Sequence, residues 1–304
     1  MTSTTSALDR ATHARGYAGP LRAGTVPSRG LVEVPIGNGG PMSIYDVRGY
    51  KTVHRAALPK SSVMNDVCMA AARLASAFKA TYTGKHDRGI YEAHVFNNTK
   101  GSSAFPRASA LCIGDYKPLY DQVRYTLSPV RETIHNIFYE EFPALCVEYE
   151  RVADKICQEH PQIIPACYPF TSLCINSGPR GVMTERHIDT QNLAPGLCCV
   201  VPYGRFDPSQ DSKIFIKELG FYFQVAAGMP IFFPSALYTH YNSKLITDGM
   251  RGSIVAWTGA AMFQYVDMGC RTVAQLTGAE YAAHKATLKE RVLNRFDMFP
   301  RRVA

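Results

Sequence analysis

The chain has 304 residues, of which 46% are hydrophobic and 19% charged, and its formal net charge is +8. This composition supports a sizeable hydrophobic core and excludes a wholly disordered chain. No apolar run approaches the length needed to cross a bilayer, and the N-terminus lacks the apolar segment of a secretory signal, so we expect an intracellular protein.

The basic charge is concentrated at the two ends of the chain. Residues 1–60 contain eight Lys/Arg and three Asp/Glu, and residues 284–304 contain six and two. Two basic ends around a nearly neutral middle would suit the grip of a phosphate backbone, or they would act only as solubilising tails. The nine cysteines form no CxxC pair, which argues against a zinc knuckle or a disulfide framework and predicts reduced, mostly buried thiols.

The first half of the chain predicts a basic, largely loop-like segment over residues 1–60 and a helical part over residues 61–165. Helical stripes of apolar residues support the second assignment, as do the helix start at Ser128-Pro129 and the proline at 143. Residues 84–110 are rich in Gly, Lys, Asn and Ser, and we expect an exposed loop or hairpin there.

From Tyr168 onward, short runs rich in β-branched and aromatic residues alternate with Gly, Pro, Asn and Asp. Their spacing predicts a β-sandwich or a jelly roll as the core over residues 166–268, within one domain that spans 61–304. A last helix is expected over 276–297, where Thr277 and Glu280 match a capping box. Its exposed face is predicted to carry Lys285, Lys289 and Arg295. The fold class is therefore α+β, with supporting helices that are mainly N-terminal.

A candidate metal site appears in the strand-rich part. His187 and Asp189 are two residues apart, so on a strand their side chains would point to the same face. His240 follows after an apolar run and would supply a third ligand from a distant strand. Two histidines and one carboxylate leave open positions on the metal, which is the ligand set of non-haem iron(II) oxygenases. The pattern alone is weak, since the chain has nine histidines.

Arg251 strengthens this interpretation. It lies eleven residues after His240, where a following strand is expected, and its guanidinium could bind the far end of a dicarboxylate in a bidentate, charge-assisted contact. Ser253 would share the same strand face and add a hydrogen bond.

The stretch from about Tyr168 to Asp267 resembles the catalytic domain of TET/JBP-type 2-oxoglutarate and iron(II)-dependent dioxygenases, especially the compact TET-like proteins of mushrooms. The resemblance runs through the segments YPFTSLCIN, RHIDTQN, CCVVPYGRF, ELGFYFQV, AGMPIFFPSALYTHYN and RGSIVAW. It implies a double-stranded β-helix (jelly roll) core and a catalytic role for the domain.

The resemblance also implies residue roles. His187, Asp189 and His240 would be the catalytic iron ligands, and Arg251 and Ser253 would anchor 2-oxoglutarate. The enzyme would use dioxygen and couple oxidation to decarboxylation of 2-oxoglutarate to succinate. Asn192 matches the place from which related enzymes touch the target base. Tyr241 and Trp257 are candidates for stacking on the substrate, with core packing as the alternative for each.

The chain departs from the family pattern at three places. Gly228-Met229 replaces the usual Gly-Asp turn, and DPSQDSK replaces an expected glycine pair. Gly259 stands where relatives often place a polar side chain in the base pocket, so this position leaves the identity of the substrate open.

Three hypotheses therefore remain. The first is oxidation of a methyl group on a modified nucleic-acid base, of the 5-methylcytosine or N6-methyladenine type, with DNA as the partner and the nucleus as the location. The second is the same oxygenase chemistry on a protein or small molecule. The third is a non-catalytic binding module that keeps the fold.

Overall fold

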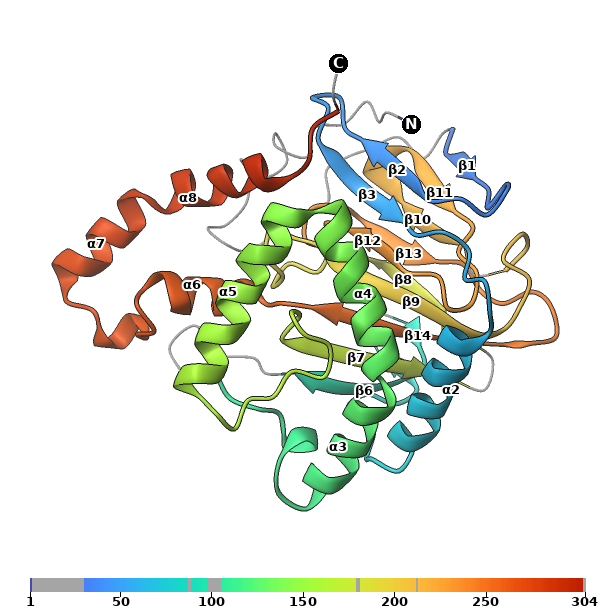
Figure 1. The fold of residues 1–304 in the computed structure, drawn as a ribbon, viewed down its shortest axis with the longest axis horizontal. Coiled ribbons are helices and arrows are strands. Elements are labelled where there is room, and N and C mark those ends of the chain that lie inside the picture. Colours follow the sequence, from blue (N-terminus) through green and yellow to red (C-terminus); the bar gives the residue numbers. More distant parts are fainter. Residues whose placement is uncertain (2–29, 87–88, 98–104, 179–180, 212, 303–304) are drawn as a thin grey trace.

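The computed structural model describes residues 1, 30–86, 89–97, 105–178, 181–211 and 213–302. Within these residues two seven-stranded sheets form the core, and helices cover one side of it (Figure 1). This confirms the α+β class and the jelly-roll core. No helix in the described part of the chain is both long and apolar enough to span a membrane.

The larger sheet carries the helices on its outer face. In sheet order its strands are β2 (Met42–Tyr45), β3 (Lys51–Arg55), β12 (Ile231–Phe233), β9 (Cys198–Arg205), β14 (Met250–Trp257), β7 (Ser172–Ser177) and β6 (Glu92–Asn97). Side chains alternate along each strand, so one face packs against the helices and the other faces the smaller sheet.

The smaller sheet carries the candidate metal ligands. In sheet order its strands are β1 (Val32–Val34), β11 (Phe221–Phe223), β10 (Ile214–Ile216), β13 (His240–Asn242), β8 (Thr184–His187), β5 (Gly89–Ile90) and β4 (Lys85–His86). Its pairs are antiparallel apart from β1 with β11.

Seven α-helices are present in the described residues: α2 (Val63–Ala75), α3 (Lys117–Thr126), α4 (Ser128–Glu141), α5 (Pro143–Glu159), α6 (Ala260–Asp267), α7 (Gly278–Ala286) and α8 (Leu288–Asn294). Phe138 of α4 stacks on Phe170 at 5.2 Å and on Phe232 of β12 at 5.9 Å. The apolar stripe of α5, which includes Tyr149 and Ile156, is buried as the sequence predicts. Burial of these aromatic rings holds the helical layer on the sheet.

The expectation of a loop over residues 1–60 is wrong where β1, β2 and β3 form. All five residues of β3 are buried, although three of them are Lys51, His54 and Arg55. Lys51 pairs with Glu141 at the end of α4, and the Arg55 guanidinium donates to backbone carbonyls. Because polar side chains occupy buried positions, the strand lacks the apolar pattern that sequence reasoning depends on. Residues 2–29 of the predicted segment lie outside the described residues.

The expectation for residues 84–110 is only partly met. β4 and β5 form a short hairpin, but β6 pairs with β7 over six residues and so belongs to the larger sheet. The sequence gives little sign of β6, because it is rich in polar residues and Ala93 and Phe96 are its only buried apolar residues.

The C-terminal helix is divided in two at Thr287, which lies between the end of α7 and the start of α8, and a 3-10 turn follows over Arg295–Met298. The predicted capping box is confirmed. Thr277 Oγ1 accepts from the Glu280 backbone N–H at 3.2 Å, and the Glu280 carboxylate accepts from the Thr277 backbone N–H at 2.8 Å. Helices α7 and α8 extend away from the two sheets (Figure 1).

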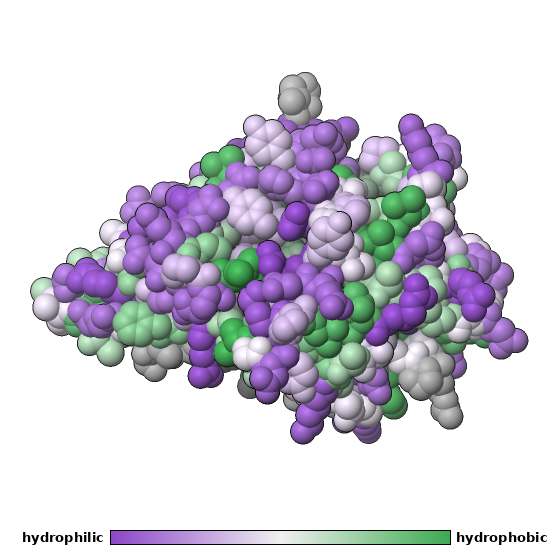
Figure 2. Space-filling model, turned by 60° about the horizontal axis from the view of Figure 1, so that its bottom comes forward, coloured by the Kyte–Doolittle hydropathy of each residue, from purple (hydrophilic) through white to green (hydrophobic). Residues whose placement is uncertain are grey.

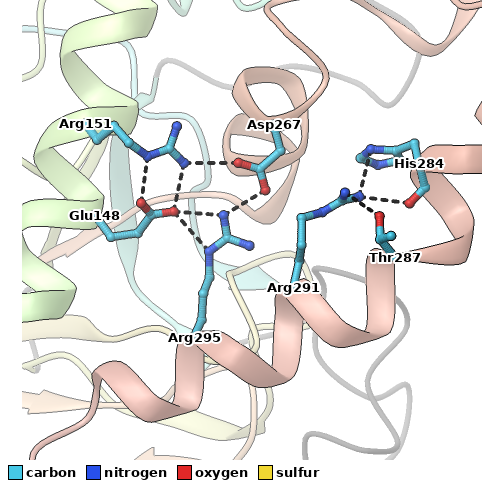
Figure 3. Close-up of polar contacts among 7 residues, drawn as sticks. All are labelled: Glu148, Arg151, Asp267, His284, Thr287, Arg291 and Arg295. Atoms are coloured by element: carbon cyan, nitrogen blue, oxygen red, sulfur yellow. Dashed lines mark hydrogen bonds and ion pairs between the residues drawn. The ribbon is translucent and has the colours of Figure 1, made fainter. Parts of the chain in front are cut away.

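The prediction of an exposed Arg295 is wrong, because its side chain is buried. Its guanidinium contacts Glu148 of α5 at 2.8 Å and Asp267 of α6 at 2.7 Å (Figure 3). Arg151 contacts the same two carboxylates. These four charged residues link the C-terminal segment to α5 and α6. The pattern of polar residues within one helix cannot reveal partners that lie so far away in the sequence.

Candidate metal centre and co-substrate pocket

His187, Asp189 and His240 converge as the sequence predicts. His187 ends β8 and is the direct partner of His240 on β13, while Asp189 lies two residues beyond the strand. The Asp189 carboxylate oxygens lie 3.9 Å from His187 Nε2 and 3.7 Å from His240 Nε2. One ligand atom from each residue lies within 4.8 Å of the others.

Backbone carbonyls fix the orientation of both imidazoles. His187 Nδ1 lies 2.6 Å from the carbonyl oxygen of Glu185, and His240 Nδ1 lies 2.9 Å from that of Tyr238. A carbonyl only accepts hydrogen bonds, so Nδ1 carries the proton and Nε2 keeps its lone pair. This arrangement holds both Nε2 atoms ready to bind a metal.

The spacing of the ligand atoms fits a shared ion. Two ligands held about 2.1 Å from one metal lie about 3 Å or more apart, as the imidazole nitrogens and the carboxylate do here. A second group, His135, Cys146 and Glu150, also converges within the described residues. There His135 Nε2 lies 2.6 Å from Glu150 Oε1, which is a hydrogen bond between the two side chains and too short for two ligands of one ion.

Asp189 is held by the segment that leads into β13. Its backbone N–H donates to the Ser235 carbonyl at 3.0 Å. Asn192 donates from Nδ2 to Ser235 Oγ at 3.0 Å and lies 3.4 Å from an Asp189 oxygen. Asn192 therefore helps to fix the carboxylate, a contact that the sequence did not reveal. Its contact with a substrate base stays a prediction, although its side chain does line the adjoining cavity.

A cavity of about 480 Å³ opens beside the three ligands, between the two sheets. Alternate residues of β14 line it in a row: Arg251, Ser253, Val255 and Trp257. The cavity therefore has a charged end near Arg251 and an aromatic end near Trp257. Figure 2 shows a face of the molecule that is mainly hydrophilic, with hydrophobic residues in small separate patches.

Arg251 has the properties of an anion-binding residue. It is only 2% exposed, and its Nη1 donates to the Val182 carbonyl at 3.3 Å. Among the described residues no carboxylate forms an ion pair with it and its Nε has no hydrogen-bond partner. Burial lowers the pKa of the guanidinium to about 10. A buried, charged group that faces a cavity in this way is stabilised by an anionic ligand.

Ser253 lies beside Arg251 on the same face of β14. Its Oγ accepts a hydrogen bond from Asn176 Nδ2 at 3.1 Å, so its own hydroxyl proton remains available to donate into the cavity. Gly252 between them has no room for a side chain, because an added Cβ would lie 2.1 Å from the Tyr203 ring. Asn176 and Tyr203 belong to the site and were missed, since neither stands near the motif in the sequence.

The two aromatic candidates differ. Trp257 is half-buried and lines the cavity. Tyr241 also lines it, but its ring stacks on Phe215 at 4.6 Å and lies under the Arg186 guanidinium at 5.2 Å. The stack with Phe215 already occupies one face of the Tyr241 ring. Stacking of either residue on a substrate stays a prediction.

Gly259 leaves space beside Asn192. The two residues form an isolated β-bridge, and an added Cβ at Gly259 would meet nothing closer than the Gln191 carbonyl oxygen at 3.9 Å. A side chain would therefore have room at this position, and the effect of Gly259 on the substrate pocket stays a prediction.

Two sheets of this topology, with a His-x-Asp pair and a distant His at one end, define a double-stranded β-helix protein with a candidate metal centre. NgTET1 in complex with 5mC DNA has a similar structure, with a TM-score of 0.53 and 14% identity over 80% of this chain and 84% of that one. This likeness establishes the shared fold.

Two other solved structures show weaker likeness. One is a 2OG-Fe(II) oxygenase family oxidoreductase from Burkholderia pseudomallei, with a TM-score of 0.38 and 12% identity over 67% of this chain and 85% of that one. The other is OsALKBH1, with a TM-score of 0.34 and 11% identity over 64% and 92%. No protein-family model matches the chain, and no curated protein does.

Proposed function

We propose that the protein is an Fe(II)- and 2-oxoglutarate-dependent dioxygenase that oxidises a methyl group on a modified nucleic-acid base. One observation carries the catalytic class: the His187, Asp189 and His240 ligand atoms open into the same cavity as a buried arginine, Arg251, for which the described part of the chain supplies no carboxylate partner. A metal site with free positions and a nearby anion anchor is what a chelating 2-oxo dicarboxylate requires.

In this proposal the site residues have two roles, binding of iron and binding of 2-oxoglutarate. His187, Asp189 and His240 hold the iron, and their backbone contacts keep the ligand atoms in place before it binds. Arg251 and Ser253 hold the distal carboxylate of 2-oxoglutarate, Arg251 by charge and Ser253 by its hydroxyl proton. Iron(II), together with 2-oxoglutarate and dioxygen, supplies the oxidising power for C–H hydroxylation.

The substrate class rests on three supports. The cavity continues past the co-substrate end to Trp257 and Asn192, and Gly259, the bridge partner of Asn192, has open space where a side chain would lie. NgTET1, which shares the fold, was solved with 5mC DNA. The net charge of +8 favours a polyanionic partner. A base in a duplex would have to leave the stack to reach this cavity. We propose 5-methylcytosine or N6-methyladenine in DNA, which implies a nuclear location.

The test is turnover on defined oligonucleotides. The protein is loaded with Fe(II) and 2-oxoglutarate under anaerobic conditions, exposed to oxygen with methylated single-stranded or duplex DNA, and the nucleosides are analysed by mass spectrometry. An oxidised nucleoside that is absent with Asp189→Ala supports the proposal. Succinate production without any oxidised nucleoside would favour a protein or small-molecule substrate. If neither succinate nor an oxidised nucleoside forms, the third hypothesis, a non-catalytic binding module, is favoured.

A further inference from the structure

Glu218 is a buried carboxylate that the proposed reaction does not use. It lies in a 3-10 turn over Lys217–Leu219, directly after β10, and is only 2% exposed. Its two oxygens accept hydrogen bonds from one residue, Thr239. The backbone N–H of Thr239 donates at 2.7 Å and its hydroxyl donates at 2.7 Å. Burial of a carboxylate is costly, so its contacts need an explanation.

Thr239 is the residue before the candidate iron ligand His240. Its carbonyl oxygen accepts a hydrogen bond from the Lys217 backbone N–H at 2.9 Å, so all three of its polar groups are held by residues 217 and 218. Ile216, which precedes this turn, is the direct partner of His240 in the pairing of β10 with β13. Two sets of contacts therefore fix the start of β13: the turn over Lys217–Leu219 holds Thr239, and pairing with β10 holds His240.

Two further residues of the segment between β12 and β13, Ser235 and Tyr238, contact candidate metal ligands. Ser235 accepts from the Asp189 backbone N–H, and Tyr238 accepts from His240 Nδ1. The segment between β12 and β13 thus supports two of the three ligands, and Glu218 holds the end of it that leads into His240. A carboxylate that offers two acceptors to one residue fixes both the position and the rotation of that residue.

We propose that Glu218 is a positioning residue that sets the location of His240 for metal binding. This inference rests on the proposed function only through the metal. Loss of the two acceptors would let the start of β13 shift, and displaced supporting groups of this kind typically cost about 10- to 100-fold in metal affinity.

The chain offers a matched control. Asp211 is a second buried carboxylate: its Oδ1 accepts from the backbone N–H groups of Ile246 at 2.6 Å and Thr247 at 3.1 Å, and its Oδ2 accepts from the Thr247 hydroxyl. It therefore does the same work as Glu218 for the loop between β13 and β14, which supplies none of the three ligands. Asp211→Ala should lower stability without weakening metal binding.

The experiment measures the affinity of the full-length apo protein for Fe(II) under anaerobic conditions, with Co(II) as a stable substitute. We expect Glu218→Ala to weaken binding about 10- to 100-fold and Asp211→Ala to leave it within about threefold. Glu218→Gln should restore most of the affinity, because its Oε1 accepts from the Thr239 N–H while its Nε2 donates to Thr239 Oγ1. Thr239→Val, which keeps the N–H contact, should lie between the two.

A second readout does not need the metal. In the apo protein, hydrogen exchange at the Thr239 amide should be faster in Glu218→Ala than in Glu218→Gln. Equal metal affinity for Glu218→Ala and the wild type would overturn the proposal, and so would equal losses in Glu218→Ala and Asp211→Ala. Failure of the wild type itself to bind metal would instead count against the proposed function. If Glu218→Ala does not fold, the comparison of Thr239→Val with the wild type decides.

Discussion

His187 and His240 stand directly opposite each other on β8 and β13, and each donates from Nδ1 to the carbonyl oxygen of the residue two positions earlier in the sequence. The same local contact thus orients both rings toward Asp189. Strand pairing and backbone carbonyls therefore fix the orientation of both imidazole ligands.

The metal site can be tested apart from catalysis. His187→Ala should remove metal binding while the apo protein keeps a cooperative unfolding transition, because the imidazole contributes ligand geometry and little core packing. Wild-type protein with metal at 100 times the dissociation constant should gain about 2.7 kcal/mol of stability. Thermal unfolding with and without Co(II) measures this gain, and a gain that persists in His187→Ala would disprove the ligand assignment.

Arg251 should matter only for co-substrates that carry a distal carboxylate. Arg251→Lys keeps a charge but loses the planar fork, so we expect 2-oxoglutarate to bind roughly 10- to 100-fold more weakly. 2-Oxobutyrate lacks that carboxylate and should bind the variant and the wild type equally. Trp257, the single tryptophan, lines the same cavity and reports binding by its fluorescence. Equal losses for both ligands would mean a general disturbance of the pocket.

The residues that sequence reasoning found stand at short spacings in one part of the chain. Arg251 and Ser253 are two apart and share one face of β14, while His187 and Asp189 are also two apart, although Asp189 lies beyond the end of β8. These relations are local and are visible in a single chain. The succession of short apolar runs predicts a sandwich or a jelly roll, and the family resemblance implies the double-stranded β-helix in particular.

The residues that sequence reasoning missed act through partners distant in the chain. Asn176 reaches Ser253 across the pairing of β7 with β14, and Glu218 reaches Thr239 across a turn. Neither contact leaves a local pattern. β3 escaped detection for a related reason: its charged residues are buried because Glu141 and backbone carbonyls lie opposite them.

Arg295 should be important for stability, unlike its neighbours on the helical surface. Arg295→Ala leaves Glu148 and Asp267 with one cationic partner fewer in a buried setting, and loss of one member of such a pair typically costs about 3–5 kcal/mol. Lys289→Ala, at an exposed position, should change the free energy of unfolding by less than about 0.5 kcal/mol. Chemical denaturation compares the two, and equal effects would show that the ion-pair group adds nothing.

His54 should make stability fall in acid. Burial, partly opposed by the charge of Glu141, lowers the pKa of the folded-state imidazole to about 4. The unfolded chain therefore binds the proton first as the pH falls below about 6.5, and stability is lost between that value and about 4. At pH 5 the loss relative to pH 7.5 should be about 2 kcal/mol. Chemical denaturation of the wild type and of His54→Gln at both pH values measures the contribution of His54 to this loss. That contribution should be absent from the variant.

Gly252 separates the two co-substrate anchors, and its replacement tests whether their spacing depends on close packing. In Gly252→Ala the new Cβ would lie 2.1 Å from the ring of Tyr203, which is buried and whose hydroxyl donates to the Asn176 carbonyl at 2.9 Å. We expect a loss of stability of about 1–3 kcal/mol from overpacking, together with weaker 2-oxoglutarate binding as β14 shifts. Gly259→Ala is the matched control, because its Cβ would meet only an atom at 3.9 Å. Tyr203→Leu should partly rescue Gly252→Ala by opening the space; if the double variant binds 2-oxoglutarate no better than the single one, contact with the ring is not what keeps residue 252 a glycine.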